Sequence, residues 1–204
     1  MEYMSLLIIC DIINYGDKMI LEALILALIS MFFIREKDLN NLINFKFKRF
    51  YLAFIGIFIM VFINFLTGRD FGSLTDFFVR NFTLFHIASL LLISLSFFSN
   101  YENKGLLICG LGTFLNALPV MANGKMPVSP SALMKIENER IIKIIYMGAS
   151  LSHGVFDKAK LYFLSDFIYL KRFVGPSKVI SLGDILIALG LYIALIIIVR
   201  KRGA

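Results

Sequence analysis

The residues with the clearest chemical potential are three aspartates in the C-terminal half of the chain, Asp157, Asp166 and Asp184. Asp184 stands at the start of a long apolar run, and a carboxylate at the mouth of a membrane helix is costly unless it has a role. Two close carboxyl groups that share one proton have pKa values driven apart and can activate water for amide cleavage. One hypothesis is therefore an intramembrane hydrolase that uses Asp157 or Asp166 together with Asp184.

A structural role also accounts for Asp184. The pattern Ser181-x-x-Asp184 before an apolar run is that of a capping box, in which the carboxylate reaches back to the Ser181 amide. The positive N-terminal end of a helix also stabilises a negative charge. Capping is the favoured interpretation of Asp184, and a role in catalysis or ligand binding is the alternative.

His153 precedes Asp157 by four residues, so the two would share one face of a helix. A carboxylate–imidazole pair suits acid–base chemistry or metal binding. The chain has two histidines, His86 and His153, and neither has the spacing of a zinc site. We therefore expect no metal and no cofactor.

Polar residues also concentrate around the end of one apolar segment. Asn116 and Asn123 are seven residues apart and share a face if one helix carries both. The leading hypothesis is a polar pocket at the outer membrane face, in a non-catalytic protein that binds a ligand, a lipid headgroup or a membrane-protein partner. Its candidate residues are Asn116, Asn123, Gly124, Met126, Pro127, His153, Asp166, Ser181 and Asp184.

Membrane helices must position these residues. Of the 204 residues, 59% are hydrophobic and 17% are charged, whereas soluble domains carry roughly 25% charged residues. A span needs about 20 mostly apolar residues, and it must be helical because lipid offers no partners to the backbone. The sequence predicts an all-α polytopic bundle of about five spans, at Met19–Ile34, Phe50–Leu66, Phe82–Phe98, Leu106–Ala122 and Ile185–Val199.

The polar segment between the last two spans, residues 123–180, is predicted to lie outside. Pro119 is expected to kink or end the preceding helix, and Asn123-Gly124 favours a turn. Ser129-Pro130 then predicts the start of an interfacial helix that runs to about Tyr146. Residues 148–170 fit either a surface-lying or a re-entrant segment.

Charge predicts the orientation. Basic residues are frequent in 35–49 and follow the last span as Arg200-Lys201-Arg202, so both segments should be cytoplasmic and the N-terminus outside. Anionic lipid headgroups explain the net charge of +7, and we expect no nucleic-acid partner. Residues 19–204 form one predicted membrane domain. Residues 1–18 are either an interfacial segment or an extension before a true start at Met19.

Three motifs resemble those of a bacterial family of small multi-span membrane proteins, catalogued as a domain of unknown function. They are Asn-Gly-x-Met-Pro-Val (123–128), Phe-Leu-x-Asp-x-Ile (163–168) and Ser-x-Gly-Asp (181–184). Members typically have a second glycine where this chain has Lys125. The resemblance covers roughly Met19 to the C-terminus and implies a fold and a place in the bacterial cytoplasmic membrane, but no activity.

The order and approximate spacing of the aspartates are similar to those of prolipoprotein signal peptidases, which are aspartic membrane hydrolases. That resemblance implies catalysis by two carboxylates near the outer ends of neighbouring spans. The chain departs from the pattern where that family has asparagine three residues before each catalytic aspartate, because Gly154 and Ser181 stand there. A third hypothesis, a small transporter or channel subunit, needs an oligomer and a water path past His86 and Asn116.

Overall fold

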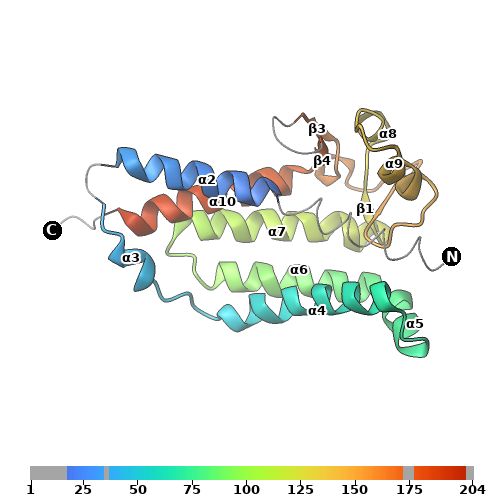
Figure 1. Cartoon of the computed structure of the whole chain (residues 1–204), viewed down its shortest axis with the longest axis horizontal. Coiled ribbons are helices and arrows are strands. Elements are labelled where there is room, and N and C mark those ends of the chain that lie inside the picture. Colours follow the sequence, from blue (N-terminus) through green and yellow to red (C-terminus); the bar gives the residue numbers. More distant parts are fainter. Residues whose placement is uncertain (1–17, 35–36, 172–176, 201–204) are drawn as a thin grey trace.

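The computed structural model describes residues 18–34, 37–171 and 177–200. It is mostly helical, and its five longest helices lie side by side in one elongated bundle (Figure 1). They are α2 (Lys18–Phe33), α4 (Phe50–Arg69), α6 (Phe82–Phe98), α7 (Lys104–Asn123) and α10 (Leu182–Val199). The predicted N-terminal extension, residues 1–18, lies outside the described residues apart from Lys18.

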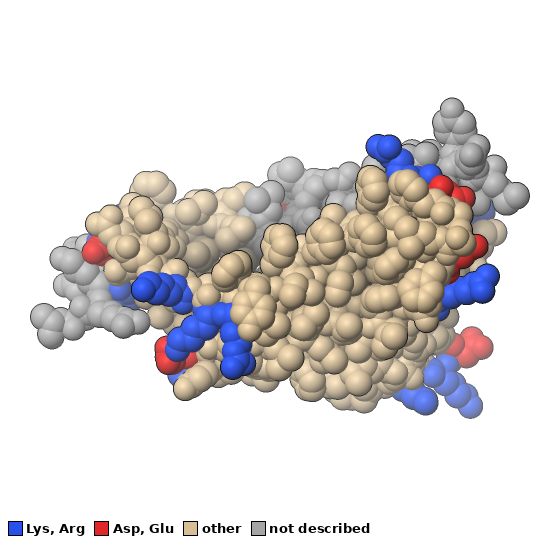
Figure 2. Space-filling view, turned by 90° about the horizontal axis from the view of Figure 1, so that it is seen from below, with Lys and Arg blue, Asp and Glu red and all other residues tan. Residues whose placement is uncertain are grey.

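Helices α4, α7 and α10 are each long and apolar enough to cross a membrane. A short helix α5 (Ser73–Arg80) and α6 together form a fourth candidate span, bent by 64° at the break between them, and α2 is a shorter apolar helix. On the face shown in Figure 2, charged side chains gather toward the two ends of the bundle, and a broad uncharged surface lies between them. The described residues thus hold three candidate spans, or four with the bent pair, where about five were predicted.

The closest helix pair is α7 with α10, and glycines make that approach possible. A β-carbon built on Gly105 would lie 2.1 Å from the backbone nitrogen of Ala194, and one built on Gly183 would lie 2.0 Å from Asn116 Oδ1. Small residues are the usual means by which membrane helices bring their backbones together. Helix α2 packs on the other side of α10, while α6 packs between α7 and α4.

One end of the bundle collects the connections rich in lysine and arginine, and we call it the basic end. Here the amide of Asp38 donates to the Val199 carbonyl at 2.8 Å, just before the short helix α3 (Asn40–Ile43). The side chain of Asn103 donates to the Ala194 carbonyl at 3.2 Å and so ties the start of α7 to the last turns of α10. These bonds hold the segment around α3 and the α6–α7 connection against the end of α10.

The other end carries the motif module, which we define as residues 124–171 and 177–181. Its parallel pair is β1 (Met126–Pro127) with β2 (His153–Gly154), and its antiparallel pair is β3 (Ile168–Leu170) with β4 (Lys178–Ile180). The remaining elements are the helices α8 (Pro130–Leu133) and α9 (Glu139–Tyr146) and the 3-10 helix η1 (Tyr162–Leu164). Val128, Leu133 and Ile136 form its small core.

One predicted feature of this region is wrong, and for Pro119 one of the two predicted effects is excluded. The interfacial helix expected from Ser129 to Tyr146 is two helices, because the Asn138 side chain accepts from the Ile141 amide at 3.2 Å and starts α9 anew. The break lets residues from α8 and α9 face the same core. Pro119 does not end α7, which continues to Asn123 and stops at Gly124, whose φ of +82° suits a left-handed helix end.

Candidate functional site

The motif strand around β1 is the centre of the motif module. On one side, the Met126 amide donates to the Ser152 carbonyl at 2.8 Å. On the other side, the Asp166 amide donates to the Pro127 carbonyl at 2.9 Å, and the Asp166 carbonyl accepts from the Ser129 amide at 2.8 Å. The buried Met126 and Pro127 therefore act through their backbones, and they bring the segments before and after residues 155–164 to opposite edges of one strand.

This pairing places His153 beside Asp166. His153 Nε2 lies 3.4 Å from Asp166 Oδ2, and Ser152 Oγ lies 2.7 Å from His153 Nδ1 on the other side of the ring. The imidazole is 36% exposed, while the Asp166 side chain is only 8% exposed. The pair is thus a carboxylate set beneath an accessible histidine. We call Ser152, His153 and Asp166 the His–Asp site.

Burial and neighbouring charge shift both ionisations in the His–Asp site. Burial raises the pKa of Asp166 to about 6, and the nearby Asp184 adds to this rise against the opposing effect of His153. Burial alone would lower the pKa of His153, but its hydrogen bond to Asp166 and the charges of Asp166 and Asp184 outweigh that effect and raise it. Asp166 therefore changes charge close to neutral pH, which is unusual for an aspartate.

Asp184 belongs to a second polar group at the contact between α7 and α10. Its Oδ2 accepts from the Ser181 amide at 3.0 Å, and Ser181 Oγ accepts from the Asp184 amide at 3.0 Å. The predicted capping box is therefore confirmed. The other carboxylate oxygen, Asp184 Oδ1, accepts from Asn116 Nδ2 at 2.7 Å, and Ser181 Oγ donates to Asn116 Oδ1 at 2.8 Å. We call Asn116, Ser181 and Asp184 the cap network.

The remaining motif residues hold the backbone in place. Asn123 Oδ1 accepts from the Lys160 amide at 2.8 Å, and Asn123 Nδ2 donates to the Lys160 carbonyl at 2.9 Å. The carbonyl of Gly124 accepts from Thr83 Oγ1 at 2.7 Å. Lys125, which stands where the resembling family has a glycine, donates its ammonium group to the carbonyls of Gly148 and Ser150. Asn123 and Asn116 both belong to α7, but Asn123 binds Lys160 of the motif module, whereas Asn116 binds Ser181 and Asp184 at the start of α10.

The sequence-based pairing of His153 with Asp157 is wrong. Residues 153–157 are not helical, and Asp157 is exposed while Asp166 takes the place beside the imidazole. Ser152 was not among the predicted site residues, since a serine next to a histidine carries no signal of its own. His86, in α6, comes close enough to interact electrostatically with His153, and its buried Nδ1 has no hydrogen-bond partner among the described residues.

The three candidate aspartates lie in three different environments. Asp157 is exposed, Asp166 contacts His153, and both oxygens of Asp184 are held by the cap network. Asp184 lies close enough to Asp166 for its charge to help raise the pKa of Asp166, but the hydrogen bonds of Asp184 go to Asn116 and Ser181, and the contact of Asp166 is with His153. No group of three or more metal-ligating side chains occurs among the described residues.

Comparison with known protein families identifies most of the chain. Residues 44–196 match a family of unknown function, DUF5317. The match leaves out α2 and begins after α3. No curated protein and no solved structure matches the chain.

Proposed function

The chain belongs to the DUF5317 family of unknown function, and from that premise we propose that it is a membrane-embedded binding protein whose site holds the ammonium group of a lipid headgroup. The site is the His–Asp site together with the neighbouring Asp184. The observation that supports this proposal most directly is an accessible imidazole above a nearly buried carboxylate, at the end of an apolar bundle.

The net charge of the site favours a cationic ligand. Asp166 and Asp184 contribute two negative charges, and a protonated His153 offsets only one of them. The site therefore keeps an excess of negative charge above the pKa of Asp166. An ammonium group is a donor with no acceptor, which suits a site that offers carboxylate oxygens. This arrangement favours binding over the aspartic hydrolase, because the cap network holds both oxygens of Asp184.

We propose five spans, with α2 and the α5–α6 pair each crossing once, the N-terminus outside and the C-terminus in the cytoplasm. The motif module then faces outward, and the basic end meets the anionic cytoplasmic leaflet. In a background with Cys10→Ala and Cys109→Ala, an impermeant maleimide added to intact cells should label Asp157→Cys and leave Glu102→Cys unlabelled. Both positions are exposed. Labelling of Glu102→Cys alone would reverse the orientation.

The binding experiment measures the rise in melting temperature of the detergent-solubilised protein on addition of phosphatidylethanolamine. At a hundredfold excess over Kd, bound ligand stabilises a protein by about 2.7 kcal/mol. We expect a rise at pH 7.5 that shrinks as the pH falls through about 6, because Asp166 then takes up a proton and the site loses negative charge. Asp166→Asn should abolish the rise at pH 7.5 and throughout the fall in pH.

The matched control is Asp157→Asn, which makes the same chemical change at an exposed carboxylate of the same module. It should respond to phosphatidylethanolamine as the parent protein does. Soluble ethanolamine forms a separate arm: a full response to ethanolamine alone would assign the site to a small amine instead of a lipid. An equal response in the parent and Asp166→Asn proteins would refute the proposed site.

A further inference from the structure

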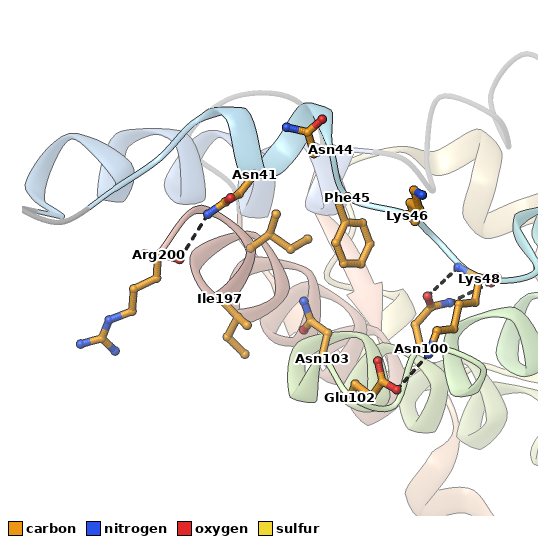
Figure 3. Close-up of a pocket in the computed structure, with 11 residues that line it drawn as sticks. Asn41, Asn44, Phe45, Lys46, Lys48, Asn100, Glu102, Asn103, Ile197 and Arg200 are labelled. Atoms are coloured by element: carbon orange, nitrogen blue, oxygen red, sulfur yellow. Dashed lines mark hydrogen bonds and ion pairs between the residues drawn. The ribbon is translucent and has the colours of Figure 1, made fainter. Parts of the chain in front are cut away.

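The basic end contains a cavity that the motif module does not touch. It has a volume of about 600 Å³ and lies between the 41–48 segment, the α6–α7 connection and the end of α10 (Figure 3). Its lining includes Asn44, Lys46, Lys48, Asn103 and Arg200. The cavity is therefore walled by segments that are far apart in the sequence, and it combines amide side chains with cations.

The wall beside Lys48 is fixed by hydrogen bonds. The Lys48 amide donates to Asn100 Oδ1 at 2.7 Å, and Asn100 Nδ2 donates to the Lys48 carbonyl at 2.9 Å. Lys48 Nζ lies 2.9 Å from Glu102 Oε1, which offsets this one cation (Figure 3). Because Asn100 is buried, it holds the extended segment against the α6–α7 connection and keeps the cavity wall in place.

The rest of the lining is electropositive. Lys46 and Arg200 line the cavity, and neither forms an ion pair with any described residue. Three cations against the single carboxylate of Glu102 leave an excess of two positive charges. Asn103, whose side chain caps the N-terminus of α7, also lines the cavity, and the helix dipole adds positive potential there. A group with concentrated negative charge would therefore be attracted.

Apolar residues on the same cavity indicate what the charged group is attached to. Phe45 and Ile197 line it together with the cations, and Ile43, the last residue of α3 and the neighbour of Asn44 in the sequence, is 84% exposed. Phe50, two residues after Lys48 at the start of α4, is a further exposed apolar side chain at 65%. A free anion would use only the polar part of this lining, whereas a lipid would use both parts.

We propose that this cavity binds the phosphate of an anionic phospholipid, with Lys46 and Arg200 beside the phosphate and the acyl chains along the exposed apolar surface. Basic pockets between membrane helices commonly bind lipid phosphates in this way. The proposal does not depend on the His–Asp site, because the two sites lie at opposite ends of the bundle and carry opposite charge.

The test measures retention of phosphatidylglycerol and phosphatidylcholine by the detergent-solubilised full chain, using native mass spectrometry. The parent protein should retain phosphatidylglycerol preferentially. The double variant Lys46→Gln, Arg200→Gln should bind it about twenty-five-fold more weakly, because each basic side chain near a headgroup contributes roughly a factor of five. Lys104→Gln is the matched control, since Lys104 is exposed at the same end but does not line the cavity.

Unchanged retention in Lys104→Gln together with loss in the double variant would support the proposal. Equal loss in both variants would show general attraction of the basic end and would overturn the site. Competition by millimolar inorganic phosphate that removes the bound lipid completely would assign the cavity to free phosphate instead. Melting temperatures of the three proteins, measured without added lipid, should agree and so separate a binding defect from unfolding.

Discussion

A Gly105→Ala variant will be strongly destabilised and will melt at a much lower temperature than the parent protein. The added carbon would lie 2.1 Å from the Ala194 nitrogen and 2.5 Å from both the Ala194 Cα and the Gly190 carbonyl oxygen. All three atoms belong to the backbone of α10, so no side-chain rotation relieves the clash. The two helices must move apart.

Overpacking a tight interior typically costs about 1–3 kcal/mol. Here the separation would also break the bond from Asn103 to the Ala194 carbonyl, which adds about 1 kcal/mol. We therefore expect a loss of about 2–4 kcal/mol in the free energy of unfolding, on the sum of those two contributions. Far-ultraviolet circular dichroism of the detergent-solubilised protein during heating would measure the shift.

Gly110→Ala is the control on the same helix. Its added carbon would lie 2.7 Å from the ring of Phe98, and that neighbour is a half-buried side chain, not a backbone. Phe98 can adjust by rotation, so the melting temperature should fall by less than half as much. Equal falls for the two variants would mean that the α7–α10 contact is not the tight interface that the structure describes.

The second large effect is expected for Asp184→Ala. The change removes the acceptor of the Ser181 amide and leaves the side chain of Asn116 without its carboxylate partner. Loss of a cap costs about 1 kcal/mol, and loss of a hydrogen bond to a charged group costs about 1.5–3 kcal/mol. A decrease of about 3 kcal/mol in the free energy of unfolding is the expected result. Chemical denaturation would measure it.

Asp157→Ala is the matched comparison, since an exposed carboxylate of the same chemistry should change stability by less than about 0.5 kcal/mol. Asp184→Asn should fall between the two, because an amide oxygen still accepts from the Ser181 amide. A purely catalytic Asp184 would behave differently: its replacement would leave stability unchanged. That outcome would restore the hydrolase hypothesis.

The local features were predictable from the sequence. Apolar run lengths located α4, α6, α7 and α10, because lipid imposes both a minimum length and a helical backbone. The capping box was visible as Ser181-x-x-Asp184, since a cap depends on four consecutive residues. Charge alternation in 130–146 indicated helix, but it could not reveal the restart at Asn138, which depends on a core shared with residues elsewhere in the module.

The site itself depends on long-range contacts, and these were not predictable. His153 meets Asp166 because each pairs with a different edge of β1, and no local period in the sequence encodes that pairing. A four-residue spacing suggested Asp157 instead, and it assumed a helix that is not there. The bond between Asn116 and Asp184 likewise joins two helices whose partnership is set by glycines that meet across the interface.

The packing of α2 against α10 has a consequence for the order of assembly. The helices α4, α6 and α7 can each pack on the helix that precedes or follows them, but α2 has its main contacts with the last helix, and Tyr192 donates to Ser30 at 3.0 Å across this pair. Contacts between such distant segments form late, because a long loop must close first. Among the described helices, α2 therefore gains its main packing partner only when α10 is in place, and α10 completes the fold on two sides at once, against α2 and against α7.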